Sequence, residues 1–119
     1  MAKKKTNPDF LNGVPELLIL QLLDREPMYG YQIVEAIRIQ SEEVLEFGEG
    51  SIYPVLHRLE AAKLLGSKRQ LVNGRQRVVY HTTSAGKKRL SASVDRWRSI
   101  TESINVMLEG VSNAKPRVA

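Results

Sequence analysis

The residues best suited to chemistry in this sequence are cations, gathered in its second half. Between Gly50 and Arg89 there are nine lysines and arginines and a single acid, Glu60. From Asp9 to Glu49 the balance reverses, with nine acids against two arginines. Such segregation favours a polyanionic partner more strongly than the net charge of +5 does. A positive surface that is merely solvated is the plain alternative.

The sequence offers few residues suited to catalysis or to metal binding. His57 and His81 are the only histidines, there is no cysteine, and no group of Asp or Glu residues around them has metal-ligand spacing. The sequence Gly48-Glu49-Gly50 lacks the preceding strand, third glycine and lysine of a phosphate-binding loop. We therefore expect no enzyme and no cofactor or metal.

Length and composition indicate one globular domain. A chain of 119 residues can enclose a single modest core. No apolar run approaches the roughly 20 residues that a membrane span needs. The absence of cysteine fits a reducing compartment. We expect a cytoplasmic protein without a membrane segment.

One amphipathic helix and one hairpin must position the cations. A helix is predicted from about Ser51 to Lys63, because apolar residues recur there at helical spacing. Its inward residues are Ile52, Val55, Leu56, Leu59 and Ala62, and its outward residues are Ser51, Pro54, His57, Arg58 and Ala61. Small groups beside one cation suit close approach to a DNA groove. Next, Asn73-Gly74 predicts a type I′ turn between strands at about 67–72 and 75–82.

Two earlier helices and a long final one complete the expected fold. The first runs from Val14 through Arg25 and is apolar over most of its circumference, so we expect it to be buried on two sides. The second follows Gly30, and an acidic loop at 41–49 should tuck Val44, Leu45 and Phe47 against the core. The last runs from Ser84 to about 109, with Thr83 as its N-cap.

The final helix carries a heptad-like apolar stripe. Its members are Leu90, Val94, Trp97, Thr101, Ile104, Leu108 and Val111. A small domain that already uses three helices has little surface left to cover this stripe. Pairing with a second copy of the helix is therefore expected.

The combined pattern resembles the PadR family of bacterial transcriptional regulators. The matching pieces are ELLILQLL, then PMYGYQI, then GSIYPVLHRLE, and a Tyr-x-x-Thr-x-x-Gly run at Tyr80, Thr83 and Gly86. The sequence departs from the family where His81-Thr82 replaces the usual Arg-Leu. The resemblance covers about residues 11–108. It implies a homodimeric repressor whose third helix enters the major groove of double-stranded DNA while the wing contacts backbone or minor groove.

The expected fold is α+β and mostly helical: a winged helix-turn-helix of three helices plus a two-stranded β-wing, with a C-terminal dimerisation helix. We divide the chain into a disordered basic tail at 1–7, a DNA-binding domain at 8–83, the dimerisation helix at 84–111 and a polar tail at 112–119. The expected DNA-binding residues are Ser51, Tyr53, Pro54, His57, Arg58, Lys68, Arg69, Asn73, Gly74, Arg75 and Arg77. The expected dimer-interface residues are Leu18, Leu22, Leu90, Val94, Trp97, Thr101, Ile104 and Leu108.

Several of these assignments keep an alternative. Tyr53 either contacts DNA or packs against the wing, and Arg58 either contacts DNA or pairs with Glu60 or an acid of the loop at 41–49. Arg75 and Arg77 either enter the minor groove or only solubilise the hairpin. Trp97 either packs in the dimer interface or, as in drug-sensing relatives, contacts a small hydrophobic effector. As a whole, the alternative to a regulator is a winged-helix module whose basic face binds an acidic protein.

Overall fold

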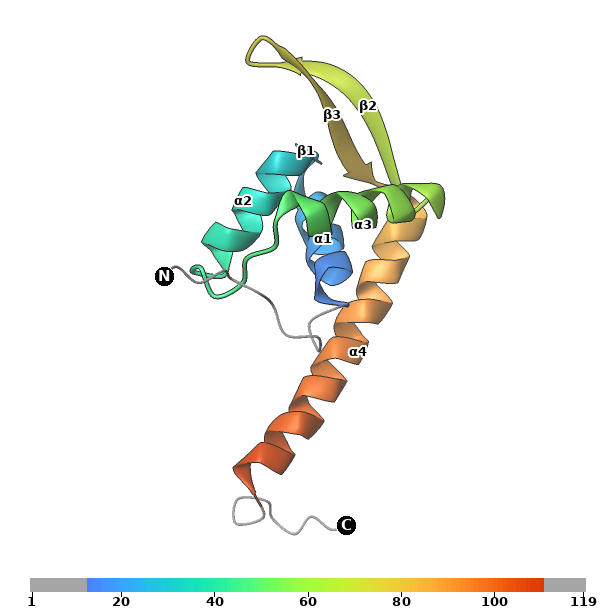
Figure 1. The fold of residues 1–119 in the computed structure, drawn as a ribbon. Coiled ribbons are helices and arrows are strands. Elements are labelled where there is room, and N and C mark those ends of the chain that lie inside the picture. Colours follow the sequence, from blue (N-terminus) through green and yellow to red (C-terminus); the bar gives the residue numbers. More distant parts are fainter. Residues whose placement is uncertain (1–12, 111–119) are drawn as a thin grey trace, which may run out of the picture.

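The computed structural model describes residues 13–110, which form four helices and three strands (Figure 1). In chain order these elements are α1 (Val14–Arg25), β1 (Met28–Tyr29), α2 (Gly30–Gln40), α3 (Glu49–Ala61), β2 (Leu65–Val72), β3 (Arg75–Thr82) and α4 (Ser84–Glu109). The expected α+β fold of helices with a β-wing is confirmed, and the return strand and final helix begin and end as predicted. The tails expected at 1–7 and 112–119 lie outside the described residues.

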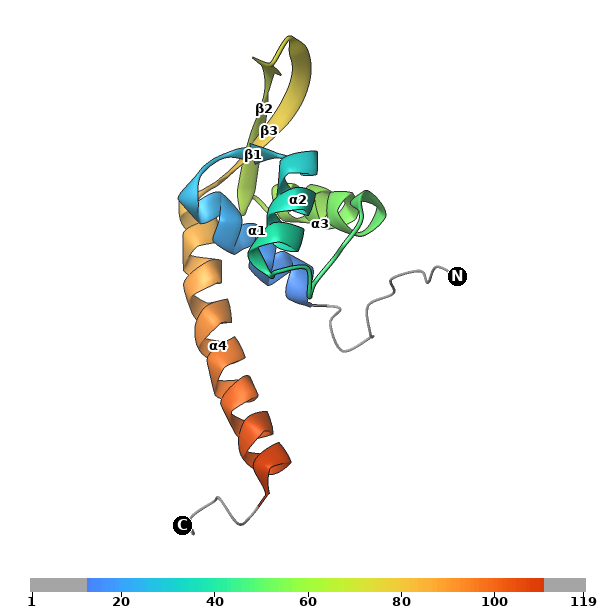
Figure 2. The same cartoon turned by 90° about the vertical axis from the view of Figure 1, so that its left-hand side faces the viewer.

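The core is built around α1. This helix lies between α4 on one side and the α2–α3 pair on the other (Figure 2). Ile19 and Leu20 are fully buried, which confirms the prediction that α1 is covered on two sides. Ile52 and Leu56 of α3 are equally inaccessible and belong to the same cluster. The amphipathic face of α3 thus fixes that helix to the core and leaves its other face to solvent.

Two local predictions around α3 are wrong. The helix begins two residues earlier and ends before Lys63, and Ala62 is exposed, since it follows the end of the helix. In the preceding loop Phe47 is buried and Leu45 packs against the core, but the side chain of Val44 is 78% exposed.

The wing is an antiparallel hairpin with the predicted turn. Asn73 has φ of 51° and Gly74 has φ of 80°, the left-handed values that a type I′ turn requires at both central positions. The two strands pair from Leu65↔Thr82 at the base to Val72↔Arg75 at the tip. The hairpin extends well beyond the helices (Figure 1).

A third strand, β1, was not expected. The sheet order is β1-β3-β2, with Met28 opposite Tyr80 and Tyr29 opposite Val79. Two residues are too few for an alternating pattern, so the sequence carried no period-2 signal here. Instead the strand is defined by pairing with β3, and it ties the base of the wing to the start of α2.

Thr83 joins the wing to α4. Its hydroxyl accepts a hydrogen bond from the N–H of Gly86 at 3.0 Å, which confirms the predicted N-cap. The same hydroxyl lies 2.9 Å from the carbonyl of Lys63 and 3.1 Å from that of Leu64, just beyond the end of α3. The backbone N–H of Thr83 also donates to Leu64 O at 3.1 Å. One residue therefore connects β3, the end of α3 and the first turn of α4.

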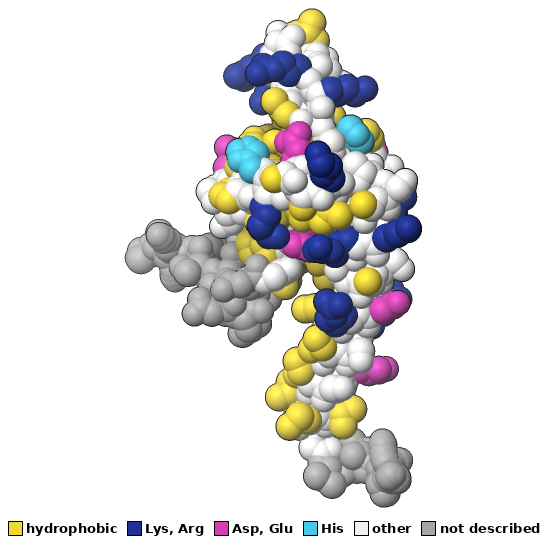
Figure 3. Space-filling model, turned by 90° about the vertical axis from the view of Figure 1, so that its right-hand side faces the viewer, with side chains coloured by type: hydrophobic (Ala, Val, Ile, Leu, Met, Phe, Trp, Pro, Cys, Tyr) yellow, Lys and Arg dark blue, Asp and Glu magenta, His cyan; other side chains and the backbone are white. Residues whose placement is uncertain are grey.

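Helix α4 starts against α1 and then leaves the body of the protein (Figures 1 and 2). Leu90 is buried and Val94 packs against the core, whereas Ile104 is 49% exposed and Leu108 is 78% exposed. Hydrophobic side chains gather along the far half of the helix (Figure 3). Within the described range, no helix is long and apolar enough to span a membrane.

Candidate nucleic-acid interface

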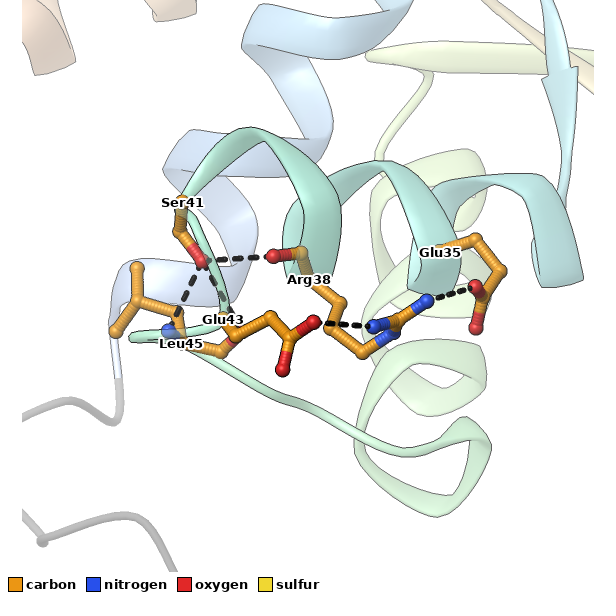
Figure 4. Close-up of polar contacts among 5 residues, drawn as sticks. All are labelled: Glu35, Arg38, Ser41, Glu43 and Leu45. Atoms are coloured by element: carbon orange, nitrogen blue, oxygen red, sulfur yellow. Dashed lines mark hydrogen bonds and ion pairs between the residues drawn. The ribbon is translucent and has the colours of Figure 1, made fainter.

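The turn between α2 and α3 sets the position of the exposed α3 face. Arg38 at the end of α2 donates to Glu35 at 2.7 Å and to Glu43 at 3.2 Å (Figure 4). The hydroxyl of Ser41 accepts from the N–H of Leu45 at 2.9 Å. Glu43 adopts φ of 66°, a left-handed value that is uncommon outside glycine, and its N–H donates to Arg38 O at 2.7 Å. These bonds hold a sharp turn, so α3 leaves it in a defined direction.

The outward side of α3 has the composition expected from the sequence. Its exposed residues are Ser51, Pro54, His57, Arg58 and Ala61. Pro54 lies near the start of the helix, and the helix continues past it to Ala61. A convex surface of small side chains with one arginine can approach a groove closely.

Tyr53 does not project freely from this face. The residue is only partly exposed, and a Cβ built on Gly30 would lie 2.3 Å from its hydroxyl oxygen. The ring therefore lies directly over the first residue of α2, where only glycine leaves space for it. The packing alternative named the wing as the neighbour of Tyr53. The ring lies over Gly30 of α2 and also lines a cavity together with Val78 of the wing.

Arg58 forms an ion pair, although not with the acids named from the sequence. Its Nη1 lies 3.0 Å from Oε1 of Glu16 on α1. The other carboxylate oxygen of Glu16, Oε2, accepts a hydrogen bond from Arg89 of α4 at 2.8 Å. Glu60 instead accepts from the hydroxyl of Ser67 at 2.7 Å. Burial raises the pKa of Glu16, but its hydrogen bonds to Arg58 and Arg89 outweigh burial and hold that pKa below its ordinary value.

Some of the cations in the basic half of the chain form ion pairs with acids of the acidic half. Arg58, Arg89 and Lys87 pair with acids of α1, the last with Asp24 at 3.0 Å. The four hairpin cations, in contrast, have no carboxylate partner within residues 13–110. They are Lys68, Arg69, Arg75 and Arg77. Lysine and arginine side chains surround the hairpin in Figure 3. The wing is therefore where uncompensated positive charge is concentrated.

Arg75 and Arg77 differ although both belong to β3. Arg75 is exposed beside the turn, and Lys68 and Arg69 are exposed in the middle of the opposite strand. Arg77 is partly buried, with its Cζ 4.5 Å from the centroid of the Tyr29 ring. The register explains this contact, because Tyr29 opposes Val79 and Arg77 is two residues along the same face. Tyr29 was not singled out from the sequence, since only the unexpected β1 brings it to the wing.

The expected dimer-interface residues fall into three groups. Leu22 and Leu90 are buried inside the subunit and expose little side-chain surface to a partner. Leu18 and Val94 are partly buried. The side chains of Trp97, Ile104 and Leu108 are between 43% and 78% exposed, and Thr101 lies among them with its hydroxyl bonded to the helix backbone at Trp97 O.

Trp97 lines a cavity of about 330 Å³ between α1 and α4. The cavity walls are Gly13, Val14, Glu16, Leu17, Ser93, Arg96, Trp97 and Ile100. Two charged residues, Glu16 and Arg96, line this space. The sequence did not point to Glu16, because this residue lies on α1, 81 positions before Trp97 in the chain.

Among residues 13–110, no group of three or more His, Cys, Asp or Glu side chains could hold a metal ion. The exposed side chains of α3 and the wing carry guanidinium, ammonium, hydroxyl and imidazole groups. These groups bind anions and hydrogen-bond acceptors such as phosphates and base edges.

Comparisons with known proteins agree with this fold. The family model described as "Transcriptional regulator PadR-like family" matches residues 19–92. Uncharacterized protein X of Lysinibacillus sphaericus is 30% identical over 104 residues, which cover 87% of this chain and 95% of that protein. Transcriptional regulator Rv3488 of Mycobacterium tuberculosis is 45% identical over 64 residues, 54% of this chain and 57% of that protein. A PadR-like transcriptional regulator of Bacillus cereus superposes with a TM-score of 0.76 at 30% identity, covering 87% of this chain and 100% of that one.

Proposed function

We propose that this chain, which belongs to the PadR-like family of transcriptional regulators, is a homodimeric repressor that binds double-stranded DNA. The family is one of regulators, not of enzymes. The third helix, α3, would enter the major groove, and the wing would contact the backbone and minor groove. Two copies would bind the halves of a pseudo-palindromic operator.

One observation carries this proposal: the exposed face of α3 and the uncompensated cations of the wing are held next to each other by hydrogen bonds. Thr83 at the base of the wing bonds the carbonyls of Lys63 and Leu64, just beyond the end of α3. Base readout needs a helix that fits the groove, and affinity needs cations that release the counterions of DNA. Base readout would come from the face of α3 that carries Ser51, Pro54 and Arg58. Affinity would come from Arg75 and the neighbouring cations of the wing.

Dimerisation would occur through α4. Its far half exposes Ile104, Met107 and Leu108 on a helix that extends away from its own domain. Such an apolar face is stable in water when a second copy covers it. Trp97 and the cavity between α1 and α4 would then lie beside the seam, where a small hydrophobic effector could enter and change the spacing of the two subunits.

Selection of bound genomic fragments, followed by fluorescence anisotropy on the recovered sequence, tests the DNA-binding proposal. We expect the logarithm of the binding constant to fall linearly with the logarithm of salt concentration, by about 0.9 per phosphate neutralised. Half-sites should be centred roughly 34–36 Å apart. No enrichment of any fragment at low salt would contradict the proposal.

The second candidate is a module that binds an acidic protein through the same wing. It is favoured only by the unpaired wing cations, which any polyanion could neutralise. Under this alternative Arg75→Ala would abolish a protein contact captured by pull-down and leave DNA affinity unchanged. Under the main proposal the same variant loses DNA affinity in the anisotropy assay.

The effector proposal has a simple optical test, because Trp97 is the only tryptophan. Titration with planar hydrophobic compounds should quench or shift its emission and, at the same concentrations, release DNA. Unchanged emission across the panel would contradict an effector site at Trp97.

A further inference from the structure

The carboxylate of Glu16 belongs both to the ion pair of Arg58 and to the cavity beside Trp97. Its Oε1 lies 3.0 Å from Nη1 of Arg58 on α3, and its Oε2 lies 2.8 Å from Nη1 of Arg89 on α4. Glu16 is also a wall of the cavity of about 330 Å³ between α1 and α4. Its side chain is 20% exposed, against 59% for Arg58, so solvent screens the carboxylate less than the guanidinium. A charge that enters the cavity therefore acts on the group that holds Arg58.

The connection between the cavity and α3 is specific to Glu16. It is the one carboxylate among the cavity walls, and it bonds directly to an arginine of α3. The other charged wall, Arg96, forms no ion pair within residues 13–110, so it gives the cavity no comparable link to the candidate recognition helix. The remaining described walls carry no charge. Any electrostatic influence of the cavity on Arg58 is thus expected to pass through Glu16.

The ion pair with Glu16 competes with DNA for Arg58. A phosphate that contacts Arg58 gains less free energy when a carboxylate already neutralises the guanidinium. A negative charge in the cavity attracts Arg58 and draws Arg89 away from Glu16, so that Arg58 is held more firmly. A positive charge offers Glu16 another cation and so loosens its hold on Arg58. The sign of the charge in the cavity therefore decides whether Arg58 becomes less or more available to DNA.

We infer that Glu16 is a positioning residue that couples the charge of whatever occupies this cavity to DNA binding by α3, an inference that rests on the proposed function. Glu16 acts through Arg58 and does not touch DNA. A ligand that brings a negative group into the cavity lowers DNA affinity, and one that brings a positive group raises it. By reciprocity, DNA changes the affinity for that ligand by the same factor. A neutral hydrophobic effector leaves this coupling unused and acts only through the spacing of the subunits.

The test places a charge in the cavity by substitution, so that it needs no ligand. Ser93 is a cavity wall and lies four residues after Arg89, on the same side of α4. We expect Ser93→Asp to lower operator affinity by about two- to threefold and Ser93→Lys to raise it by a similar factor, the range of partly exposed ion pairs. Anisotropy at fixed low salt measures both. Ser91→Asp and Ser91→Lys are the matched controls, because Ser91 is exposed and lies on nearly the opposite side of the helix.

The same substitutions in a Glu16→Gln background separate the coupling from general effects of charge. There the Ser93 variants should change DNA affinity no more than the Ser91 variants do, and circular dichroism should show that each variant is folded. Either Ser93 variant alone completes the cycle. Effects of Ser93 that persist undiminished without the carboxylate would overturn the inference, as would equal effects at Ser91 and Ser93 in the wild type. Both results leave the proposed function standing, whereas failure of the wild-type protein to bind any fragment would overturn that function as well.

Discussion

Glu16 on α1 lies 3.0 Å from Arg58 on α3, so an acid of the core-forming helix holds the single cation on the outward side of the candidate recognition helix. The Arg58 side chain remains 59% exposed, so a DNA phosphate can reach it. Because the same carboxylate also accepts from Arg89 at 2.8 Å, Glu16 connects α1, α3 and α4 through two charged hydrogen bonds.

Substituting Glu16→Gln should lower the free energy of unfolding at neutral pH by about 1 kcal/mol, as expected for partly exposed ion pairs. The folded-state pKa of Glu16 is held below its ordinary value of 4.5. Its contribution is therefore present above pH 4.5 and is lost as pH falls through the lower folded-state pKa. Urea unfolding should show a difference in the free energy of unfolding between the wild type and Glu16→Gln at pH 7, and this difference should shrink near pH 3. A difference that grows on acidification would contradict this assignment.

The same substitution should increase DNA affinity by about two- to fivefold, since Arg58 no longer has to leave a carboxylate to meet a phosphate. Arg58→Ala should weaken binding and reduce the salt dependence by about one phosphate contact. Anisotropy on the selected operator measures both. Asp24→Asn is the control, because it removes an α1 acid that pairs with Lys87 rather than with α3. Equal gains from the two α1 substitutions would indicate only a general effect of net charge.

Replacing Ile104→Asp together with Leu108→Asp should convert a dimer into a monomer that no longer binds the operator. Two carboxylates in an apolar seam would lose hydration without gaining partners. Light scattering measures the mass directly. Ser99→Asp with Val106→Asp adds the same charge on the opposite side of α4 and should stay dimeric. A dimer from the first variant would show that α4 is not the interface.

Gly30→Ala should destabilise the fold by about 1–3 kcal/mol, the usual cost of overpacking, because the added methyl would meet the Tyr53 ring. Gly50→Ala in the first turn of α3 has nothing within 4 Å and should be neutral or slightly stabilising. Urea unfolding of Gly30→Ala in a Tyr53→Ala background completes the cycle. The loss in the free energy of unfolding caused by Gly30→Ala should be smaller in the Tyr53→Ala background. Fully additive losses would mean that the two residues do not compete for space.

Local patterns in the sequence were sufficient for the elements whose determinants are neighbours in the chain. Asn73-Gly74 specified its own turn, Thr83 specified the start of α4, and apolar spacing specified the buried side of α3. The family motifs added the arrangement of these elements. Each of these signals is contained within a few residues of the feature that it predicts.

The contacts that could not be predicted join distant positions. The pairing of Arg58 with Glu16 spans 42 positions, and that of Arg89 with Glu16 spans 73. The Tyr29–Arg77 contact depends on β1, which is too short to have a pattern of its own. Charge segregation was likewise misleading in part, because acidic and basic halves of the chain also neutralise one another across the core.

The hydroxyl of Thr83 has a mechanical consequence. A Cβ built on Gly86 would lie 2.2 Å from the carbonyl oxygen of Leu64, so the first turn of α4 packs directly against the segment that follows α3. Together with the bonds of Thr83, this contact joins the base of the wing closely to the start of α4. In a dimer joined through α4, a small change in the angle between the two long helices becomes a tilt of both wings. A displacement at the far end of α4 would therefore be passed through Thr83 to the wing.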